Sequence, residues 1–280
     1  MNRSRGEGQA YRIAACQFQS RPADISFNLT KMTDHVTRAH AAGAHLCVLP
    51  ECCLTGMPVT VDVGDEILAL APDLSTKDSA SPVAQLQRLA QDLGMHLVFG
   101  TPERVGRSVF NSAIHVESSG KIVSTYHKAH AWPGNERFFK PGDSLQVDEG
   151  PEGFLGILIC FDLEFPELPR ALALRGANVL VAPMANMDPW ADFQRTFARA
   201  RAMENSVFVV VANTIGENQG DVYFGGSIVV DPAGQVLAEA GRHEAVIVAD
   251  IDLGEIPLAV AGTRYLELRR PSLYGDLVLE

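Results

Sequence analysis

The sequence predicts an α/β fold in which sheets are layered into a sandwich and helices cover the outside. Two observations support this prediction. Apolar, β-branched runs alternate with segments of helical periodicity, and several neighbouring runs are joined by hairpin turns, which a purely parallel sheet would lack. The chain has 280 residues, 46% of them hydrophobic, and this is enough to build one large core in a single domain.

The first half of the chain alternates strands and helices. Gly43 and Gly94 end two predicted helices, and Pro50 ends a strand because it has no N–H for the ladder. Ser119 and Gly120 form a hairpin turn. The predicted elements are the strand 11–17, the helix 25–42, the strand 45–49, the helix 82–93, the strand 95–100, the paired strands 110–118 and 121–127, and a long irregular loop, 129–142.

The second half is arranged around Cys160. The apolar run 156–159 predicts a buried strand, and Cys160 lies where that run stops. Pro166 opens a helical pattern that ends before Gly176. The remaining predicted elements are the strand 178–182, the helix 190–206, the strand 207–212, the hairpin 224–230 and 235–240 around the turn 231–234, and the strand 245–251.

Composition excludes several classes of partner and cofactor. The net charge is -11 and the pI is about 5.2, which argues against nucleic-acid binding because that binding needs clustered Lys and Arg. The five cysteines have no CxxC spacing, so neither a disulfide framework nor a cysteine zinc site is expected. We therefore expect no metal, no organic cofactor and a reducing compartment, the cytoplasm.

Three further expectations concern the ends of the chain and its organisation. Residues 1–10 are predicted to be a disordered amino end, because they are polar and have none of the apolar core of a secretory signal. No run approaches the ~18 apolar residues of a membrane span, so no membrane contact is expected. Residues 11–262 are predicted to form one domain, and the Arg-containing tail 263–280 is a candidate assembly arm.

Three predicted strand ends present three reactive side chains, Glu51, Lys128 and Cys160. A thiol nucleophile needs a base to take its proton, and acyl transfer needs a cation or N–H pair where the carbonyl oxygen becomes negative. Glu, Lys and Cys are able to fill those roles. The simpler interpretation is that Cys160 is a small core residue and that Glu51 and Lys128 are solvated rim residues.

The segments around these residues resemble the three signature segments of the nitrilase superfamily of carbon–nitrogen hydrolases. All three occur in the order of the family. They are Leu49-Pro50-Glu51, then His127-Lys128-Ala129-His130 with Glu136-Arg137-Phe138-Phe139-Lys140-Pro141-Gly142, and then Ile159-Cys160-Phe161-Asp162-Leu163-Glu164-Phe165-Pro166-Glu167. Further matches, such as Ala185-Asn186 and Gly226-Ser227, extend the resemblance over about 11–251.

The resemblance implies a four-layer α-β-β-α sandwich, with residues 11–262 as a carbon–nitrogen hydrolase domain that forms a homodimer or a larger homo-oligomer. It also implies a catalytic triad in which Glu51 is the general base, Lys128 supports the tetrahedral intermediate and Cys160 is the nucleophile. Glu136 matches an additional glutamate of the family, which helps to position the substrate and the lysine.

Other residues are candidates for substrate binding. The backbone N–H of Phe161 is expected to help hold the oxyanion. Trp132, Asn186 and Met187 lie on loops that follow strands toward the same face, as do Asp188 and Trp190, although loop packing or helix capping would also explain these residues. Glu164 stands where many amidase-like members have Arg, and this departure favours neutral or amine-bearing amides.

The sequence therefore predicts an amidohydrolase that cleaves a small linear amide to a carboxylic acid and ammonia through a Cys160 thioester. Phe161-Asp162 after the cysteine resembles the amidase and carbamoylase branches, whereas true nitrilases typically have Trp-Glu there. The alternatives are an N-carbamoyl amino compound hydrolase, a nitrilase, and a catalytically silent relative that binds a partner or a metabolite. The expected partner is a small-molecule amide substrate.

Overall fold

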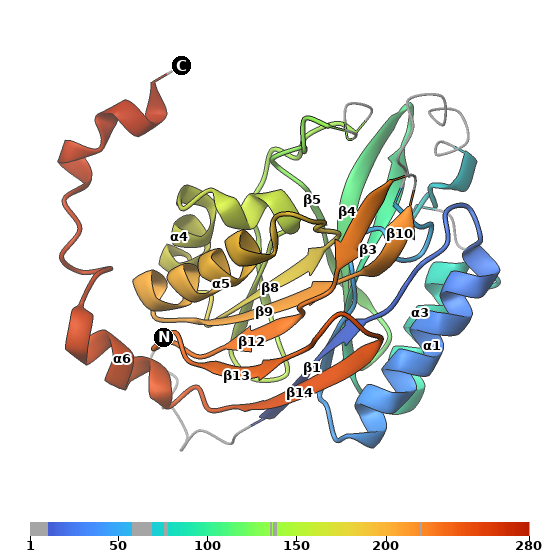
Figure 1. Cartoon of the computed structure of the whole chain (residues 1–280), viewed down its shortest axis with the longest axis horizontal. Coiled ribbons are helices and arrows are strands. Elements are labelled where there is room, and N and C mark those ends of the chain that lie inside the picture. The colour runs from blue at the N-terminus through green and yellow to red at the C-terminus, as the bar shows by residue number, and fades with distance from the viewer. Residues whose placement is uncertain are drawn as a thin grey trace.

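The computed structural model describes residues 11–57, 69–75, 78–134, 136, 139–218 and 220–279. Their main feature is a pair of six-stranded sheets packed face to face. Helices cover the two outer faces, and a carboxyl-terminal segment extends away from the sandwich (Figure 1). The amino end 1–10, for which disorder is predicted, lies outside the described residues.

The first sheet has the strand order β14-β1-β2-β3-β4-β5. Its central strands β1, β2 and β3 are parallel, and the outer pairs are antiparallel. Two amphipathic helices, α1 (Ile25–Ala41) and α3 (Pro82–Leu93), cover its outer face. The strands are β1 (Tyr11–Gln17), β2 (Leu46–Val48), β3 (His96–Val105), β4 (Ser108–Val116), β5 (Ile122–His127) and β14 (Ala245–Ile251).

The second sheet has the order β13-β12-β9-β8-β7-β6, with β7, β8 and β9 parallel. Helices α4 (Glu167–Leu174) and α5 (Ala191–Asn205) cover its outer face. A separate hairpin, β10 (Ile215–Asn218) and β11 (Asp221–Phe224), follows β9. The strands of the second six-stranded sheet are β6 (Val147–Glu149), β7 (Phe154–Ile157), β8 (Val179–Met184), β9 (Phe208–Asn213), β12 (Ile228–Val230) and β13 (Val236–Glu239).

Three apolar layers hold the sandwich together. The middle layer lies between the sheets and contains Ile13, Val48, Ile157 and Val210, none of them more than 1% exposed. The other two layers lie between each sheet and its helices. Side chains of a strand alternate between the two faces of its sheet, so the long apolar runs of the parallel strands are buried on both sides. The predicted α-β-β-α sandwich is therefore confirmed.

Several predicted elements differ in detail from the structure. The strand before the cysteine ends at Ile157, because the chain turns into a short 3₁₀ helix, η2 (Cys160–Glu164), ahead of α4. The predicted strand 224–230 is interrupted where Gly225 and Gly226 take positive φ angles of 74° and 63°. The hairpin partner β10 is not predicted from the sequence, and neither is β6.

The carboxyl-terminal part contains a helix that the sequence analysis does not predict, α6 (Glu255–Thr263). None of its residues is buried, so it lacks the one-sided apolar pattern by which a helix is recognised. Beyond it come two short 3₁₀ turns, η3 (Pro271–Leu273) and η4 (Gly275–Val278). Among the described helices, none has the length and apolar character needed to cross a membrane.

A buried polar chain connects the two sheets at one edge. His115 on β4 contacts Asp148 on β6 through Nδ1, at 3.0 Å, and its Nε2 lies 3.0 Å from Nδ1 of His96 on β3. The Ser124 hydroxyl donates to the same Asp148 carboxylate. Burial, and next the neighbouring His115, lower the pKa of His96 to about 4. A neutral His96 is therefore part of the folded structure.

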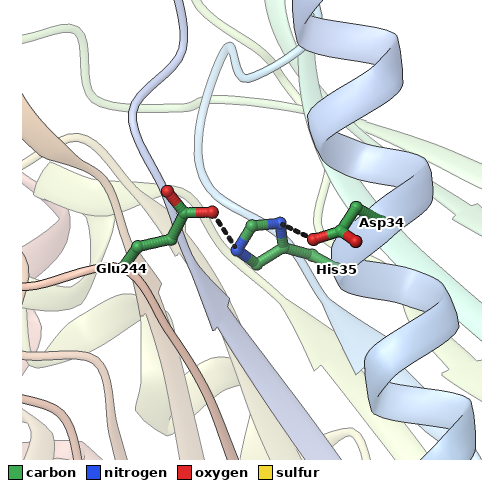
Figure 2. A group of neighbouring side chains, drawn as sticks. All are labelled: Asp34, His35 and Glu244. Carbon is green, nitrogen blue, oxygen red and sulfur yellow. Dashed lines mark ion pairs between the residues drawn. The ribbon is translucent and has the colours of Figure 1, made fainter.

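A second buried histidine, His35 on α1, fastens this helix to the segment before β14 (Figure 2). Its Nδ1 lies 2.8 Å from the Lys31 carbonyl oxygen and 3.8 Å from Asp34, and its Nε2 lies 3.3 Å from Glu244. The two carboxylates face opposite ring nitrogens, and Lys31 already pairs with Glu244 at 2.9 Å. The group therefore joins elements instead of enclosing one ion. Burial lowers the pKa of His35.

We expect the protein to lose stability as the pH falls from about 6.5 toward 4, because His35 and His96 titrate below the ~6.5 of an unfolded chain. In this window the unfolded chain binds protons that the folded chain does not, so the free energy of unfolding decreases as the pH falls. Urea unfolding midpoints across this range measure the decrease. His96→Gln should make it shallower, and an unchanged pH dependence in that variant would contradict the assignment.

Candidate active site

Glu51 lies directly after β2, on a turn that crosses from the first sheet to the second. Its backbone N–H donates to the carbonyl oxygen of Met184 at the end of β8, at 3.2 Å. Gly100 on β3 permits this turn to come close, since a Cβ atom there would lie 2.5 Å from the Glu51 Cα. The carboxylate is buried and accepts a hydrogen bond from the N–H of Ala185, at 2.8 Å. Both sheets therefore fix its position.

Lys128 follows β5 and lies between two carboxylates. Its ammonium group donates to Glu51 Oε1 at 2.8 Å and to both oxygens of Glu136 at 2.8 and 2.9 Å. Glu136 comes from the loop after β5, and the backbone N–H of Trp132 holds it at 2.6 Å. All three charged side chains are at most 3% exposed. The sequence-predicted Glu51, Lys128 and Glu136 are thus brought together in one buried cluster.

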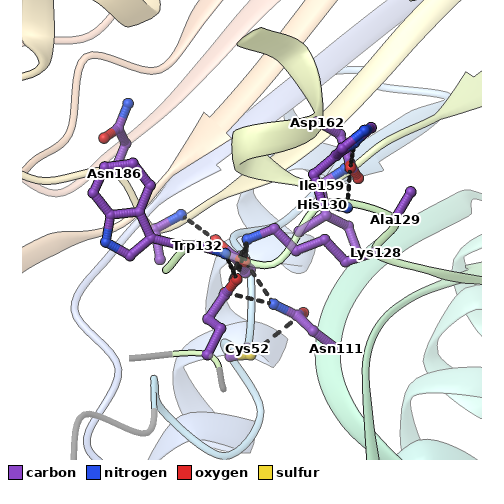
Figure 3. A network of polar contacts seen from close by, with 12 residues as sticks. Cys52, Asn111, Lys128, Ala129, His130, Trp132, Ile159, Asp162 and Asn186 are labelled. Atoms are coloured by element: carbon purple, nitrogen blue, oxygen red, sulfur yellow. Dashed lines mark hydrogen bonds and ion pairs between the residues drawn. The ribbon is translucent and has the colours of Figure 1, made fainter. Parts of the chain in front are cut away.

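Asn111 on β4 is a member of this cluster that the sequence analysis does not identify. Its Nδ2 donates to Glu51 Oε1 at 2.7 Å and to Glu136 Oε1 at 3.0 Å (Figure 3). Its Oδ1 lies 3.6 Å from the Cys52 thiol. The amide therefore bridges the same two oxygens as the lysine. Cys52 is fully buried against the cluster, so its thiol is part of the packed core.

Cys160 begins the 3₁₀ helix η2 with φ 46°. A non-glycine residue in this left-handed region is strained, and such strain is common at functional sites. The turn is held by Asp162, whose buried carboxylate accepts hydrogen bonds from the Ile159 N–H at 3.0 Å and the Tyr126 hydroxyl at 2.8 Å. His130 donates to the other oxygen from its backbone, at 2.9 Å, and from its ring, at 2.8 Å. These bonds fix the direction of the thiol.

Burial and neighbouring charges shift the pKa values of the cluster. Desolvation, and then Glu51, raise the pKa of Cys160 well above its usual value, so the resting side chain is a thiol. Burial alone would lower the pKa of Lys128, but attraction by Glu51 and Glu136 raises it. Burial is also the largest cause that raises the pKa of Glu136, to about 7, although Lys128 opposes it. At neutral pH the lysine is charged, and Glu136 is close to its titration point.

One small cavity joins these groups. It measures about 20 Å³, little more than the space one water molecule requires. Eleven described residues line it, and nine of them are the predicted site residues, which the structure thus brings together. They are Glu51, Lys128, Trp132, Glu136, Cys160, Phe161, Glu164, Asn186 and Met187. Met57 and Ala185 complete the lining. Ala185 belongs to the matching segment Ala185-Asn186, whereas Met57 has no feature in the sequence that marks it.

Aromatic rings form the outer wall of the cavity. Trp132 stands at right angles to Phe161, with ring centroids 5.0 Å apart, and its other edge faces Trp190 at 6.3 Å. Edge-to-face pairs of this kind are favourable beyond the area they bury. Asn186 is fixed through Asn213, which accepts from its backbone N–H at 2.7 Å. The wall is therefore apolar, with polar groups at a few fixed positions.

Asp188 and Trp190, the two other candidates from the sequence, do not line this cavity. Asp188 pairs with Arg242 through two hydrogen bonds, at 2.8 and 2.9 Å, and does not face the thiol. His127 contacts Glu103 at 2.7 Å, and so lies apart from His130, which contacts Asp162. Within the described lining, the carboxylates of Glu51 and Glu136 are both paired with Lys128.

Comparison with known proteins adds a family match. Residues 12–259 match the family model described as "Carbon-nitrogen hydrolase". The chain is 34% identical to an (R)-stereoselective amidase from Pseudomonas sp., over 95% of this chain and 93% of that protein. A mutant of the amidase from Nesterenkonia sp. AN1, in complex with butyramide, superposes with a TM-score of 0.83 at 30% identity, covering 97% of this chain and 98% of that one.

Another structure of the same Nesterenkonia amidase bears on the cysteine. It shows covalent addition of the acetamide moiety of fluoroacetamide at the active-site cysteine of that protein. Its TM-score is 0.82 at 30% identity, and the match covers 97% of this chain and 98% of that chain. This relative therefore shares the fold of this chain and has a reactive cysteine, and in this chain Cys160 lines the cavity.

We expect Asp162→Asn to destabilise the protein, because the amide group replaces an acceptor oxygen and leaves two buried donors without a partner. The expected loss is about 2–3 kcal/mol of unfolding free energy, measured by urea unfolding. Asp192→Asn, at an exposed position of α5, is the matched control and should change the free energy by less than about 0.5 kcal/mol. Equal effects of the two substitutions would contradict the role of Asp162.

Proposed function

Because the chain belongs to the carbon–nitrogen hydrolase family, we propose that it is an amidohydrolase, which converts a small linear amide to a carboxylic acid and ammonia through a thioester on Cys160. The observation that supports this most strongly is the shared cavity, where the Cys160 thiol meets Glu51, Lys128 and Glu136. These groups match the needs of acyl transfer, which are a nucleophile, a base and a cation near the developing oxyanion.

The first step is attack of the thiol on the amide carbon. Since burial and Glu51 keep the pKa of Cys160 high, the thiol must lose its proton during the attack, and a base has to accept it. Glu51 is that base in our proposal. Its carboxylate is held on three sides by Lys128, Asn111 and the Ala185 N–H, at 2.7–2.8 Å, and lines the same cavity as the thiol.

The tetrahedral intermediate places negative charge on the former carbonyl oxygen. The Lys128 ammonium group supplies the positive charge that this oxygen needs. The Phe161 N–H is a second donor, because the first bond of η2 is made one residue later, from Asp162 to Ile159 at 3.0 Å. N–H groups at the start of a helical turn have no partner within the turn. Lys128 and Phe161 both line the cavity that Cys160 lines.

Collapse of the intermediate requires the proton to return. Glu51 donates it to the leaving nitrogen, the C–N bond breaks and ammonia departs, which leaves the thioester. Glu51 then takes a proton from water, the resulting hydroxide attacks the thioester carbon, and the carboxylic acid is released with the thiol restored. Glu136, which contacts Lys128 through both oxygens, positions the lysine throughout. The names of the relatives, an (R)-stereoselective amidase and an amidase bound to butyramide, support this chemistry.

We expect Cys160→Ala to abolish ammonia release from any primary amide that the wild-type protein hydrolyses, because no other described thiol lines the cavity. The loss should exceed about 1,000-fold, as expected when a covalent nucleophile is removed. The assay is ammonia release from a panel of primary amides, N-carbamoyl amino compounds and nitriles, with both proteins side by side.

The matched control is Cys47→Ala, which removes a buried thiol of the layer between the first sheet and its helices. This variant should retain amide hydrolysis. Amide hydrolysis that persists in Cys160→Ala would refute the thioester, and turnover of nitriles or carbamoyl compounds alone would replace the amidase assignment by one of those reactions.

We further propose that the carboxyl-terminal segment, residues 255–279, is an arm that packs against a second copy of this chain. It carries large apolar side chains in water, with Leu258, Leu268 and Val278 exposed by 76%, 65% and 83%. Ile256 and Leu266 pack partly against the core. From residue 267 on the segment has no buried residue and extends away from the sandwich (Figure 1). Exposed apolar surface of this extent is typical of a protein interface, and symmetric homodimers are the commonest assembly.

Removal of residues 264–280 should shift the protein from a dimer or larger assembly to smaller species. The reason is that the apolar residues of the arm would no longer bury surface on the partner. Sedimentation velocity of the full-length and shortened chains measures the change, and the thermal unfolding temperature shows whether the sandwich stays folded. A full-length protein that sediments as a monomer would contradict the proposal.

A further inference from the structure

Glu164 is the carboxylate of the cavity that has no hydrogen-bond or ion-pair partner among the described residues. It ends η2, four residues after Cys160, and lines the same cavity. Its side chain is half-buried, and among the described residues it forms no hydrogen bond and no ion pair. The other carboxylates of the cavity differ, because Glu51 and Glu136 each accept at least three hydrogen bonds.

Arg201, the described arginine whose charge acts on Glu164, donates its hydrogen bonds to other acceptors. Arg201 on α5 donates from Nε to the Leu163 carbonyl oxygen, at 2.9 Å, and from Nη2 to the backbone oxygen of Glu164, at 2.7 Å. Its Nη1 contacts Glu204 at 3.1 Å. It therefore fixes the end of η2 without pairing with the Glu164 carboxylate. Burial raises the pKa of that carboxylate, while Lys128 and Arg201 act in the opposite direction.

The charges of the cavity favour a cation. Three carboxylates, Glu51, Glu136 and Glu164, face a single ammonium group, that of Lys128, among the described lining residues. The net charge of these four side chains is negative even when Glu136 holds a proton. Negatively charged ligands are repelled by such a site and positively charged ligands are attracted. The face of an aromatic ring such as that of Trp132 also attracts an ammonium group.

The distance from Glu164 to the thiol limits how far the amine of a substrate lies from its amide carbon. Four residues of a 3₁₀ helix, at about 2 Å each, put the Cα atoms of Cys160 and Glu164 roughly 8 Å apart. Both side chains line the same cavity. A substrate with its amine a few bonds from the amide carbon spans the remaining gap.

We infer that this site takes small amides that carry a protonated amine, and that Glu164 binds the substrate ammonium group and so determines specificity. The inference rests on the proposed amidohydrolase function and names the substrate class of the same site. A half-buried carboxylate without a partner is costly, and a charge-assisted hydrogen bond to an ammonium group supplies what it lacks. Glu164 acts here as a specificity residue and takes no part in bond cleavage.

The test compares three small amides of matched size and different charge. β-Alaninamide is a cation at neutral pH, butyramide is its uncharged isostere, and malonamate is an anion. We expect kcat/KM, from ammonia release, to be about 10- to 100-fold higher for β-alaninamide than for butyramide, and lowest for malonamate. Glu164→Gln should lower kcat/KM for β-alaninamide by a similar factor, mainly through KM, and change butyramide less than about 3-fold.

Two further variants separate specificity from a structural effect. Glu164→Arg should reverse the order and favour malonamate. Glu167→Gln, at an exposed position of the same segment, should keep the wild-type order. If butyramide has a kcat/KM equal to that of β-alaninamide, and Cys160 is needed for both, this inference is overturned and the proposed function is left intact. Equal losses for both substrates in Glu164→Gln would also overturn it. Hydrolysis of no amide by the wild-type protein would overturn the proposed function itself.

Discussion

The contact on which the rest of the site depends is the one between the Lys128 ammonium group and two buried glutamates. Lys128 pairs with Glu51 and with Glu136, each at 2.8 Å, and a buried carboxylate needs such a partner because burial disfavours its charge. Replacing a buried ion pair by apolar residues is often neutral or stabilising. Stability therefore does not explain why these charges are buried. The chemistry does, because a base and a cation at fixed positions near a thiol are what acyl transfer needs.

The packed sheets give these groups their precision. Glu51 is supplied by the first sheet, and Cys160 follows a strand of the second. The backbone bonds from Glu51 to Met184 and from Ala185 to Glu51 cross between the sheets. The site is consequently assembled only when the two sheets pack, and rigid strands hold its parts more accurately than loops alone. The bonds to Asp162 have the same purpose on the nucleophile side.

The parts of the site that were predictable from the sequence lie where a strand stops. An apolar run followed by a chain breaker marks such a position, as with Pro50 before Glu51 and the turn at Cys160. Asn111 was not predictable, because it lies within a strand and nothing local indicates which polar side chain turns inward. Helix α6 was not predictable for a different reason. It has no buried face, so its sequence has no periodic apolar signal.

The excess negative charge in the cavity also has a consequence for how the nucleophile is activated. Burial, and after it Glu51 and Glu136, raise the pKa of Cys160, so the side chain rests as a protonated thiol. A protonated amine bound at Glu164 adds a positive charge to the same small cavity and lowers the pKa of the thiol. Binding of the substrate and activation of the thiol are then linked through charge alone. An uncharged amide lacks this effect, and for it the transfer of the proton to Glu51 has to overcome the full negative field.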